Sequence, residues 1–384
     1  MRIKISTLNL DVFIIAIIVQ VFTVNYESAG IISYLKYIVC LLGIITSMAI
    51  MMRQHRKLVM TDDMERLLTV PILFVGITVI KGIYVHTFSQ RTVIEFLLMT
   101  IPIVYSYCLI NTLSARQLEK AMMATLIVSF MGYLYNLGMS PNMIIKSLIA
   151  SNFAASNSAL ESSQFAGISI SLCLYYLYYR KNRTGAILSF IFVIFTFKRL
   201  AILMALVMLF LPRVFDVTKA VKKKTFRIII ATVFVCSIVY FWVMIPQNGQ
   251  SVQNAFNINL DEFTMGRFWR FSLLYNNPNY VNYGLGSTYT YLMKTRGFAL
   301  EMDICRLMLE VTAIGVAIFV YQYFAVVRKN WYCTLLMMYL FFNMITSHCL
   351  ASMFSWLIIY MTIGSIQYLD NKCGVKVAFK IDKR

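Results

Sequence analysis

Charged side chains are scarce in this sequence of 384 residues, and acidic ones are scarcer than basic ones. Charged residues make up 13% of the chain and hydrophobic residues 60%, with 35 Lys and Arg but only 16 Asp and Glu. A soluble domain has about a quarter of its residues charged. The shortage therefore argues against a soluble protein, and apolar runs of nearly bilayer-spanning length recur from end to end.

Motifs for several familiar chemistries are also missing. The sequence has no P-loop, no HExxH and no GxSxG, and its three histidines stand far apart. The eight cysteines are equally scattered, without a CxxC or a His/Cys cluster. These absences argue against a nucleotide-binding loop, a histidine or zinc metal site and a disulfide framework. We expect no metal and no cofactor.

The basic residues form short clusters between the apolar runs. They give a net charge of +19, but they form no aromatic-interleaved patch, so nucleic-acid binding is not expected. If the N-terminus is inside, every cytoplasmic segment carries Lys or Arg, most of all residues 213–227, as the positive-inside rule requires. The sequence therefore predicts an all-α, polytopic protein of the cytoplasmic (inner) membrane, with about twelve transmembrane helices and both termini in the cytoplasm.

We interpret residues 1–384 as a single integral membrane domain. Two predicted outer loops stand out, residues 139–164 and the large polar insertion 246–302, while residues 369–384 form a cytoplasmic tail. A polar insertion of this size in so hydrophobic a chain is more often functional than a linker. The predicted spans are 8–25, 31–52, 67–85, 93–110, 119–138, 165–179, 185–197, 200–212, 228–245, 304–326, 332–347 and 350–368.

Lys198 and Arg199 interrupt the apolar stretch 185–212. One long helix would bury both cations near the middle of the membrane and would reverse the orientation of every later segment. Two short helices, each about 20 Å long at 1.5 Å per residue, avoid both consequences. Their connecting turn would lie below the outer surface in a water-filled recess, and charge at such depth generally marks a cavity or a substrate path.

Charged and polar residues on the predicted outer side are the functional candidates. Guanidinium groups bind phosphate oxygens in bidentate geometry, so several in one outer recess would suit a lipid-linked pyrophosphate. A carboxylate beside them would accept a proton from an attacking hydroxyl. The candidates are Lys198 and Arg199 in the recessed turn, Arg267 and Arg270 in the large loop, Asp303, Arg306 and Glu310 on one face of the tenth predicted helix, and, further, Glu161, Gln164, Glu301 and His348.

Each group also has a purely structural interpretation. The three residues of the tenth helix suit an ion-pair ladder at a helix start. The two loop arginines suit solvated charges or contacts to anionic headgroups, and Glu161 suits an acid in a first helical turn. A structural role is hardest to sustain for Arg199, because of its predicted depth.

Four segments resemble the Wzy-type polysaccharide polymerases of bacteria, part of the O-antigen polymerase and ligase superfamily. The resemblance covers roughly residues 160–325, whereas the first five helices match only in their hydrophobic, polytopic character. The motifs are short, so their order along the chain carries most of the similarity. The segments are 161–166, 195–201 with its Lys-Arg pair, Gly266–Arg267 followed by 282–287, and 303–315 with Asp303, Arg306, Glu310 and Gly315.

The resemblance implies transfer of an oligosaccharide from one undecaprenyl-pyrophosphate carrier to another carrier-linked repeat unit on the outer face of the membrane, building a capsule, O-antigen or exopolysaccharide. Neither a nucleotide sugar nor a metal is then required. Arg199 and Arg267 match the family's functional arginines, which would hold the pyrophosphate with Arg270 and Arg306. The partners would be the lipid-linked oligosaccharide, membrane lipids, and a flippase and a chain-length regulator of the same pathway.

The sequence departs from the family at two places. The family often has a histidine just before the acid of its tenth-helix motif, but none precedes Asp303 here. The general base is therefore open between Asp303, Glu310 and Glu301, or none of them. We favour Asp303, which lies nearer the loop, with Glu310 orienting Arg306. The family's later glycine is also missing, with Thr312 near its place.

A glycan ligase of the same superfamily and a transporter or flippase are the alternatives. Motifs separate ligase from polymerase poorly. Transporters often show internal repeats with helix breaks at matching positions. No repeat is visible in this sequence, and its polar residues concentrate in one predicted outer loop, so we favour the polymerase.

Overall fold

The computed structural model describes residues 5–22, 31–53, 57–138, 142, 161–179, 182–214, 216–275 and 277–369. Within these ranges the regular secondary structure is helical and includes no strand, as the sequence predicted. Each predicted span coincides with a helix. These helices are α1 (Ile5–Phe22), α2 (Ile31–Arg53), α3 (Thr61–Tyr84), α4 (Gln90–Thr112), α5 (Ala115–Asn136), α7 (Ser163–Tyr179), α8 (Arg183–Phe195), α9 (Arg199–Phe210), α10 (Lys223–Met244), α15 (Asp303–Val327), α16 (Trp331–Thr346) and α17 (Met353–Gly364), which continues into a π-helical turn at Ser365–Leu369.

Short polar side chains fix where several of these helices begin. The Ser89 side chain accepts a hydrogen bond from a backbone N–H at the start of α4, and Ser114 forms a capping box with Gln117 at the start of α5. Asn182 and Asn330 cap α8 and α16 in the same way. Such caps satisfy N–H groups that a helix leaves without partners, so the chain can turn back within a few residues.

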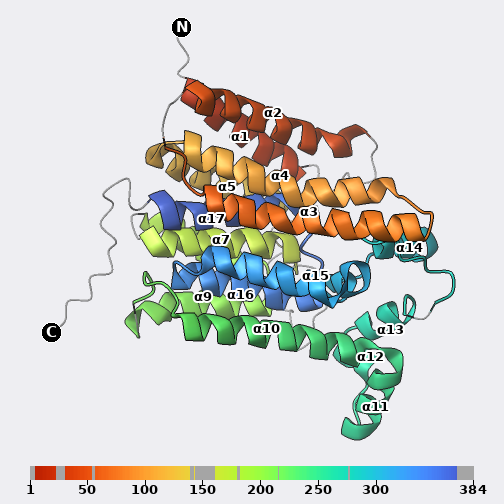
Figure 1. Cartoon of the computed structure of the whole chain (residues 1–384). Coiled ribbons are helices and arrows are strands. Elements are labelled where there is room, and N and C mark those ends of the chain that lie inside the picture. The colour runs from red at the N-terminus through yellow and green to blue at the C-terminus, as the bar shows by residue number, and fades with distance from the viewer. Residues whose placement is uncertain are drawn as a thin grey trace.

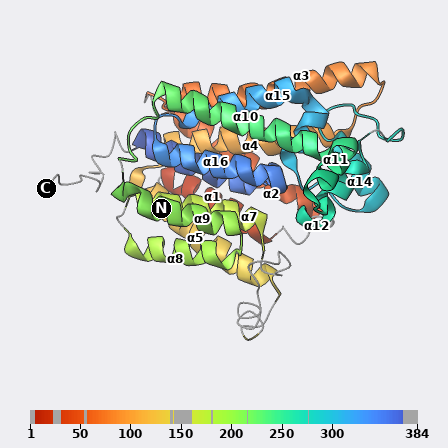
Figure 2. The ribbon, with the colours of Figure 1, turned by 90° about the horizontal axis from the view of Figure 1, so that it is seen from below.

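The helices lie side by side in one bundle, and successive helices run in opposite directions (Figures 1 and 2). In its interior α17 packs against α4 and α7, while α15 packs against α3, α10 and α16. Every second connection therefore reaches the same end of the bundle. We call the end where α1 begins and α17 ends the terminal end, and the opposite end the capped end.

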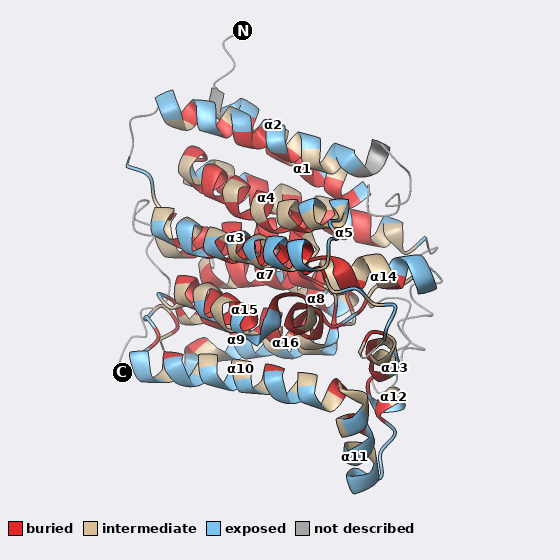
Figure 3. Ribbon diagram, turned by 45° about the vertical axis from the view of Figure 1, so that its right-hand side comes forward, coloured by how far each residue is buried: buried red, intermediate tan, exposed pale blue. Residues whose placement is uncertain are grey.

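Large apolar side chains cover the outside of the bundle. Five helices in the described part of the chain are long and apolar enough to cross a membrane, namely Tyr34–Arg53, Thr61–Tyr84, Gln90–Thr112, Lys223–Met244 and Asp303–Val327. The outer faces of α2, α3 and α10 are exposed and carry residues such as Ile45, Ile80 and Val239 (Figure 3). An apolar surface this extensive requires a lipid environment. The chain is therefore a membrane-embedded protein.

The seventh and eighth predicted spans are two short helices, not one long one. Helix α8 ends at Phe195 and α9 begins at Arg199. Between them Phe197 adopts a left-handed backbone conformation with φ of 49°, which reverses the chain. The carbonyl of Thr196 in this turn accepts a hydrogen bond from the Ser162 N–H at 3.3 Å. The turn therefore lies at the capped end, beside the start of α7.

The polar insertion 246–302, predicted as an outer loop, contains short helices and forms a cap. Its helices cover part of the capped end and extend beyond α10 (Figure 1). They are α11 (Pro246–Phe256), α12 (Leu260–Phe263), α13 (Arg267–Ser272) and α14 (Ser287–Arg296). The other predicted outer loop, 139–164, lies outside the described residues except for 142 and 161–164, and so does the predicted tail beyond Leu369.

A separate apolar cluster holds the cap on the bundle. Phe268 and Phe271 of α13 and Leu292 of α14 pack with Met244 at the end of α10 and Met302 just before α15. Burial of side chains of this size contributes about 1.5–3 kcal/mol each. The cap is therefore fixed to the ends of two bundle helices, and the segment leading into α15 has a defined position.

Candidate functional site

Four charged side chains at the capped end are almost completely buried. They are Glu95 of α4 and Asp303, Arg306 and Glu310 of α15, and each is at most 1% exposed. Steps of three and four residues place the last three on one face of α15, as predicted. Because an unpaired buried charge is strongly destabilising, the partners of these four groups define the site.

Arg306 is held by acids from two helices. Its Nη1 donates a hydrogen bond to Oε1 of Glu95 at 3.2 Å, and its Nε lies 3.6 Å from Oδ1 of Asp303. The same Glu95 oxygen accepts two hydrogen bonds from Arg91, one turn earlier on α4, at 2.6 and 2.9 Å. Nη2 of Arg306 makes no hydrogen bond within the described residues. The site thus contains a fixed guanidinium with a donor to spare.

Both carboxylate oxygens of Asp303 are occupied. Oδ1 lies 2.8 Å from Nδ1 of His348, and Oδ2 accepts hydrogen bonds from the backbone N–H groups of Cys349 and Leu350 at 2.7 and 2.6 Å. An ionised carboxylate only accepts, so Nδ1 of the neutral imidazole carries the hydrogen and Nε2 is an acceptor. The side chain of His348 is 22% exposed, whereas that of Asp303 is fully buried. Asp303 therefore orients an accessible histidine.

Glu310 anchors the cap to α15. Its Oε1 accepts hydrogen bonds from the backbone N–H and the hydroxyl of Thr288, in the first turn of α14, at 3.1 and 2.6 Å. Its Oε2 has no hydrogen-bond partner among the described residues. We predicted that Glu310 orients Arg306, but the hydrogen-bonded acid is Glu95.

Burial and the nearby Glu310 carboxylate raise the pKa of Tyr280 in the cap, so this phenol stays protonated.

Helix α15 is broken just after Glu310. Thr312 has φ of 70° and ψ of 166°, a combination that is essentially restricted to glycine. Two carbonyls of the preceding turn accept hydrogen bonds from other elements. Lys81 Nζ donates to the carbonyls of Leu309 and Glu310 at 3.2 and 2.8 Å, and Asn282 Nδ2 donates to that of Leu309 at 2.6 Å. Thr312 thus adopts a glycine-like backbone.

The two predicted cap arginines meet at one carboxylate. Arg270 Nη1 lies 2.8 Å from Oε1 of Glu301, and Arg267 Nη2 lies 3.9 Å from its Oε2. Arg267 also donates to the carbonyl of Thr264 at 3.0 Å. The Glu301 side chain is 48% exposed and stands two residues before Asp303. The group therefore lies next to the buried cluster and in contact with solvent.

In the Lys-Arg pair between α8 and α9, the lysine is the buried member. Lys198 is 9% exposed, and its Nζ lies 2.8 Å from Oε1 of Glu161. Arg199 is exposed at the first position of α9, and Gln164 is half-buried in the first turn of α7. All the candidates that the sequence identified lie at the capped end, where Lys198 and Glu161 form an ion pair.

Sequence reasoning missed Arg91, Glu95 and Lys81. A usable signal was present, because Lys81 and Glu95 fall inside predicted spans, and ionisable residues within a membrane segment are functional candidates by default. Arg91 stands four residues before Glu95, the spacing of a helical ion pair. His348 was identified, but its partner in Asp303 lies 45 residues away in sequence and was not foreseen.

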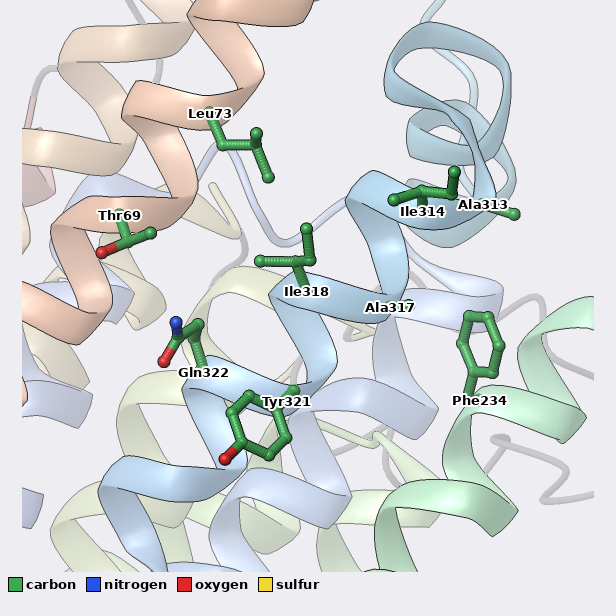
Figure 4. A pocket seen from close by; sticks show the side chains of 9 residues that line it. All are labelled: Thr69, Leu73, Phe234, Ala313, Ile314, Ala317, Ile318, Tyr321 and Gln322. Atoms are coloured by element: carbon green, nitrogen blue, oxygen red, sulfur yellow. The ribbon is translucent and has the colours of Figure 1, made fainter.

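An apolar groove of about 630 Å³ opens on the outer face of α15, between α3 and α10. Leu73 of α3, Phe234 of α10 and Ile318 of α15 are among the residues that line it (Figure 4). Ala313 and Ile314, which follow the break at Thr312, border one end of the groove. The groove therefore lies on the helix that also carries Asp303, Arg306 and Glu310.

Fold and site together define a helical membrane protein with a buried charged centre under a polar cap. In the described ranges, no group of three or more His, Cys, Asp or Glu side chains is arranged to hold a metal ion. Comparison of the chain with protein-family models, with curated proteins and with solved structures gives no match.

Proposed function

We propose that the protein polymerises undecaprenyl-pyrophosphate-linked oligosaccharide repeat units into a surface polysaccharide, on the outer face of the cytoplasmic membrane. The observation that carries the proposal is the group formed by the buried Glu95, Asp303 and Arg306 with the accessible His348. A fixed cation and an acid-held histidine are the two groups that glycosyl transfer from a pyrophosphate requires, one for the leaving charge and one for the proton.

In this proposal all twelve bundle helices cross the membrane, with the terminal end in the cytoplasm and the cap outside. Charge distribution supports the orientation. The basic segment 213–227 and the pair Arg328–Lys329 connect helices at the terminal end (Figure 1). Basic connections of this kind stay on the cytoplasmic side. Lipid-linked repeat units would therefore meet the site from the outer leaflet.

The reaction forms one C–O bond and breaks another. A sugar hydroxyl of the acceptor attacks the anomeric carbon of the donor sugar, whose bond to the pyrophosphate oxygen breaks with the electron pair leaving on that oxygen. The hydroxyl proton passes to Nε2 of His348. We assign this step to His348 in place of Asp303, because both oxygens of Asp303 are occupied. Asp303 then acts as a positioning residue.

Positive charge and an apolar groove would hold the carrier. Pyrophosphate is already a good leaving group, so the protein mainly supplies position and charge stabilisation. Arg306 has an unused donor in the described structure, while Arg199 is exposed and Arg267 and Arg270 are partly exposed at the same end. The groove beside α15 suits the long apolar chain of the carrier.

Replacing His348 by asparagine tests the proposal. Asparagine can still donate a hydrogen bond to Asp303, but it cannot accept a proton. We expect surface polymer to fall roughly 10²–10⁴-fold, as for loss of a general base, while single-repeat glycolipid accumulates and the amount of membrane-inserted protein is unchanged. His86→Asn is the matched control, because His86 is an exposed histidine in the α3–α4 connection at the same end.

Two outcomes would contradict the proposal, and they are distinct. Normal polymer from His348→Asn removes the histidine from the reaction. Polymer that persists in the host when the whole chain is deleted overturns the proposed function itself.

A further inference from the structure

An aromatic pair, the exposed Trp269 and the half-buried Phe298, lies beside the arginine–glutamate group of the cap. Trp269 of α13 is 45% exposed, and its ring centroid is 5.9 Å from that of Phe298, with 45° between the ring planes. The Arg270 guanidinium lies 5.0 Å from the centroid of the Phe298 ring. Two aromatic rings, a guanidinium and the carboxylate of Glu301 therefore form one continuous surface.

This surface matches the chemistry of a sugar ring. A pyranose presents a face of C–H groups and a rim of hydroxyls. The electron-rich face of an aromatic ring packs against the C–H groups. Charged groups that accept or donate several hydrogen bonds bind the hydroxyls. Glu301 is 48% exposed and has further acceptor capacity. The Arg270 side chain is 25% exposed, so its guanidinium supplies donors on the same surface.

The position of the pair relates it to the buried cluster. Glu301 is separated from Asp303 only by Met302, which is fully buried in the apolar cluster of the cap and whose sulfur accepts a hydrogen bond from the Tyr240 hydroxyl at 3.4 Å. Because this connection is packed, the surface around Trp269 has a fixed relation to the Asp303–His348 pair. A saccharide on Trp269 would therefore occupy a defined place relative to the proton acceptor.

We propose that Trp269 and Phe298, together with Arg270 and Glu301, form a saccharide-binding platform for the sugars of the lipid-linked repeat unit. The platform rests on the proposed function, since that function supplies the saccharide. Aromatic side chains at a membrane boundary also contact lipid headgroups. The ion pair of Arg270 with Glu301 directly beside the rings favours a hydroxyl-rich ligand over lipid, and the experiment below separates the two.

Binding of a soluble glycan to the purified protein tests the platform without any turnover. The probe is the reducing oligosaccharide released by mild acid from the lipid-linked repeat units of the host, titrated by calorimetry into the full chain in detergent. We expect Trp269→Ala to weaken binding at least about tenfold, because it removes the stacking face. Trp269→Tyr should retain most of the affinity. Trp242→Ala is the matched control, since Trp242 is equally exposed (49%) at the end of α10.

Each result has a single meaning. Equal affinity of wild type and Trp269→Ala overturns the platform. Brominated phosphatidylglycerol in reconstituted vesicles should quench the fluorescence of Trp242 far more than that of Trp269. The Trp242→Phe and Trp269→Phe variants identify the contribution of each residue. Equal quenching of the two tryptophans also overturns the platform. Failure of the proposed function looks different. In that case the glycan binds wild type and not Trp269→Ala, yet polymer persists in the host without the chain.

Discussion

The two ends of the bundle both bury acidic side chains, but they complete the hydrogen bonding of these charges to different degrees. At the terminal end Asp63 is 3% exposed and accepts hydrogen bonds from Lys329, at 3.0 Å, and from the Tyr368 hydroxyl. At the capped end Arg306 and Glu310 each keep a buried polar atom without a hydrogen-bond partner in the described structure. A completed network ties helices together, whereas an incomplete one retains capacity for a ligand.

The largest expected difference between the ends is in stability. Arg306→Met should destabilise the protein by about 3–5 kcal/mol, because it leaves Glu95 and Asp303 as poorly compensated buried charges. Lys329→Met removes a side chain that is 52% exposed, so this substitution should lower the free energy of unfolding by at most about 1 kcal/mol. Thermal unfolding midpoints of both variants in the same detergent measure the difference. Equal shifts in the two midpoints would remove the contrast between the ends.

Arg199 and Arg213 allow the same comparison along one short helix. Arg199 begins α9 at the capped end, and Arg213 follows α9 at the terminal end. Under the proposed function, Arg199→Ala should lower polymer roughly 10²–10³-fold, as for the loss of one charge-stabilising group, with the protein level unchanged. Arg199→Lys should restore part of the activity, since a point charge lacks the bidentate fork.

Arg213→Ala is the control for this experiment, and it should leave both polymer and protein level near wild type. Polymer of normal amount and length from Arg199→Ala would remove this arginine from the mechanism. A fall in protein abundance with normal polymer per molecule would instead indicate a structural role for Arg199.

The arrangement of helices was largely predictable because each one leaves a strong local signal. Apolar runs of nearly spanning length predicted the positions of the bundle helices, and the Lys198–Arg199 interruption predicted two short helices, which α8 and α9 confirm. The cap was less predictable. Its helices are short and polar, and they are held by packing of Phe268 and Phe271 against distant apolar residues. Local sequence does not encode such tertiary contacts.

The candidate site was predictable as a set of residues but not as a set of pairs. Spacing alone placed Asp303, Arg306 and Glu310 on one face. Their hydrogen-bond partners come from other elements, with Glu95 contributed by α4 and His348 by the α16–α17 turn. The members of these pairs are far apart in the sequence, so spacing cannot predict them. The sequence therefore favoured Asp303 as the proton acceptor, although both of its oxygens already accept hydrogen bonds.

The break in α15 offers the smallest but most direct test of strain at the capped end. A β-branched residue at φ of 70° and ψ of 166° is destabilised by about 1–3 kcal/mol relative to glycine. Thr312 is exposed, so shortening its side chain loses little packing. Part of this gain in stability is offset because glycine gives the unfolded chain more conformational entropy, which destabilises the folded state by about 0.5–1 kcal/mol. Thr312→Gly should therefore stabilise the protein by about 1 kcal/mol.

Thr312→Ala separates backbone strain from loss of the threonine side chain. Alanine keeps the Cβ and with it the strain, so its midpoint should stay at the wild-type value or fall, whereas Thr312→Gly should raise the midpoint by roughly 1–3 °C. The direction of the difference matters more than its size. A glycine variant less stable than the alanine variant would mean that the backbone at this position is relaxed. The break would then follow from the hydrogen bonds of Lys81 and Asn282 alone.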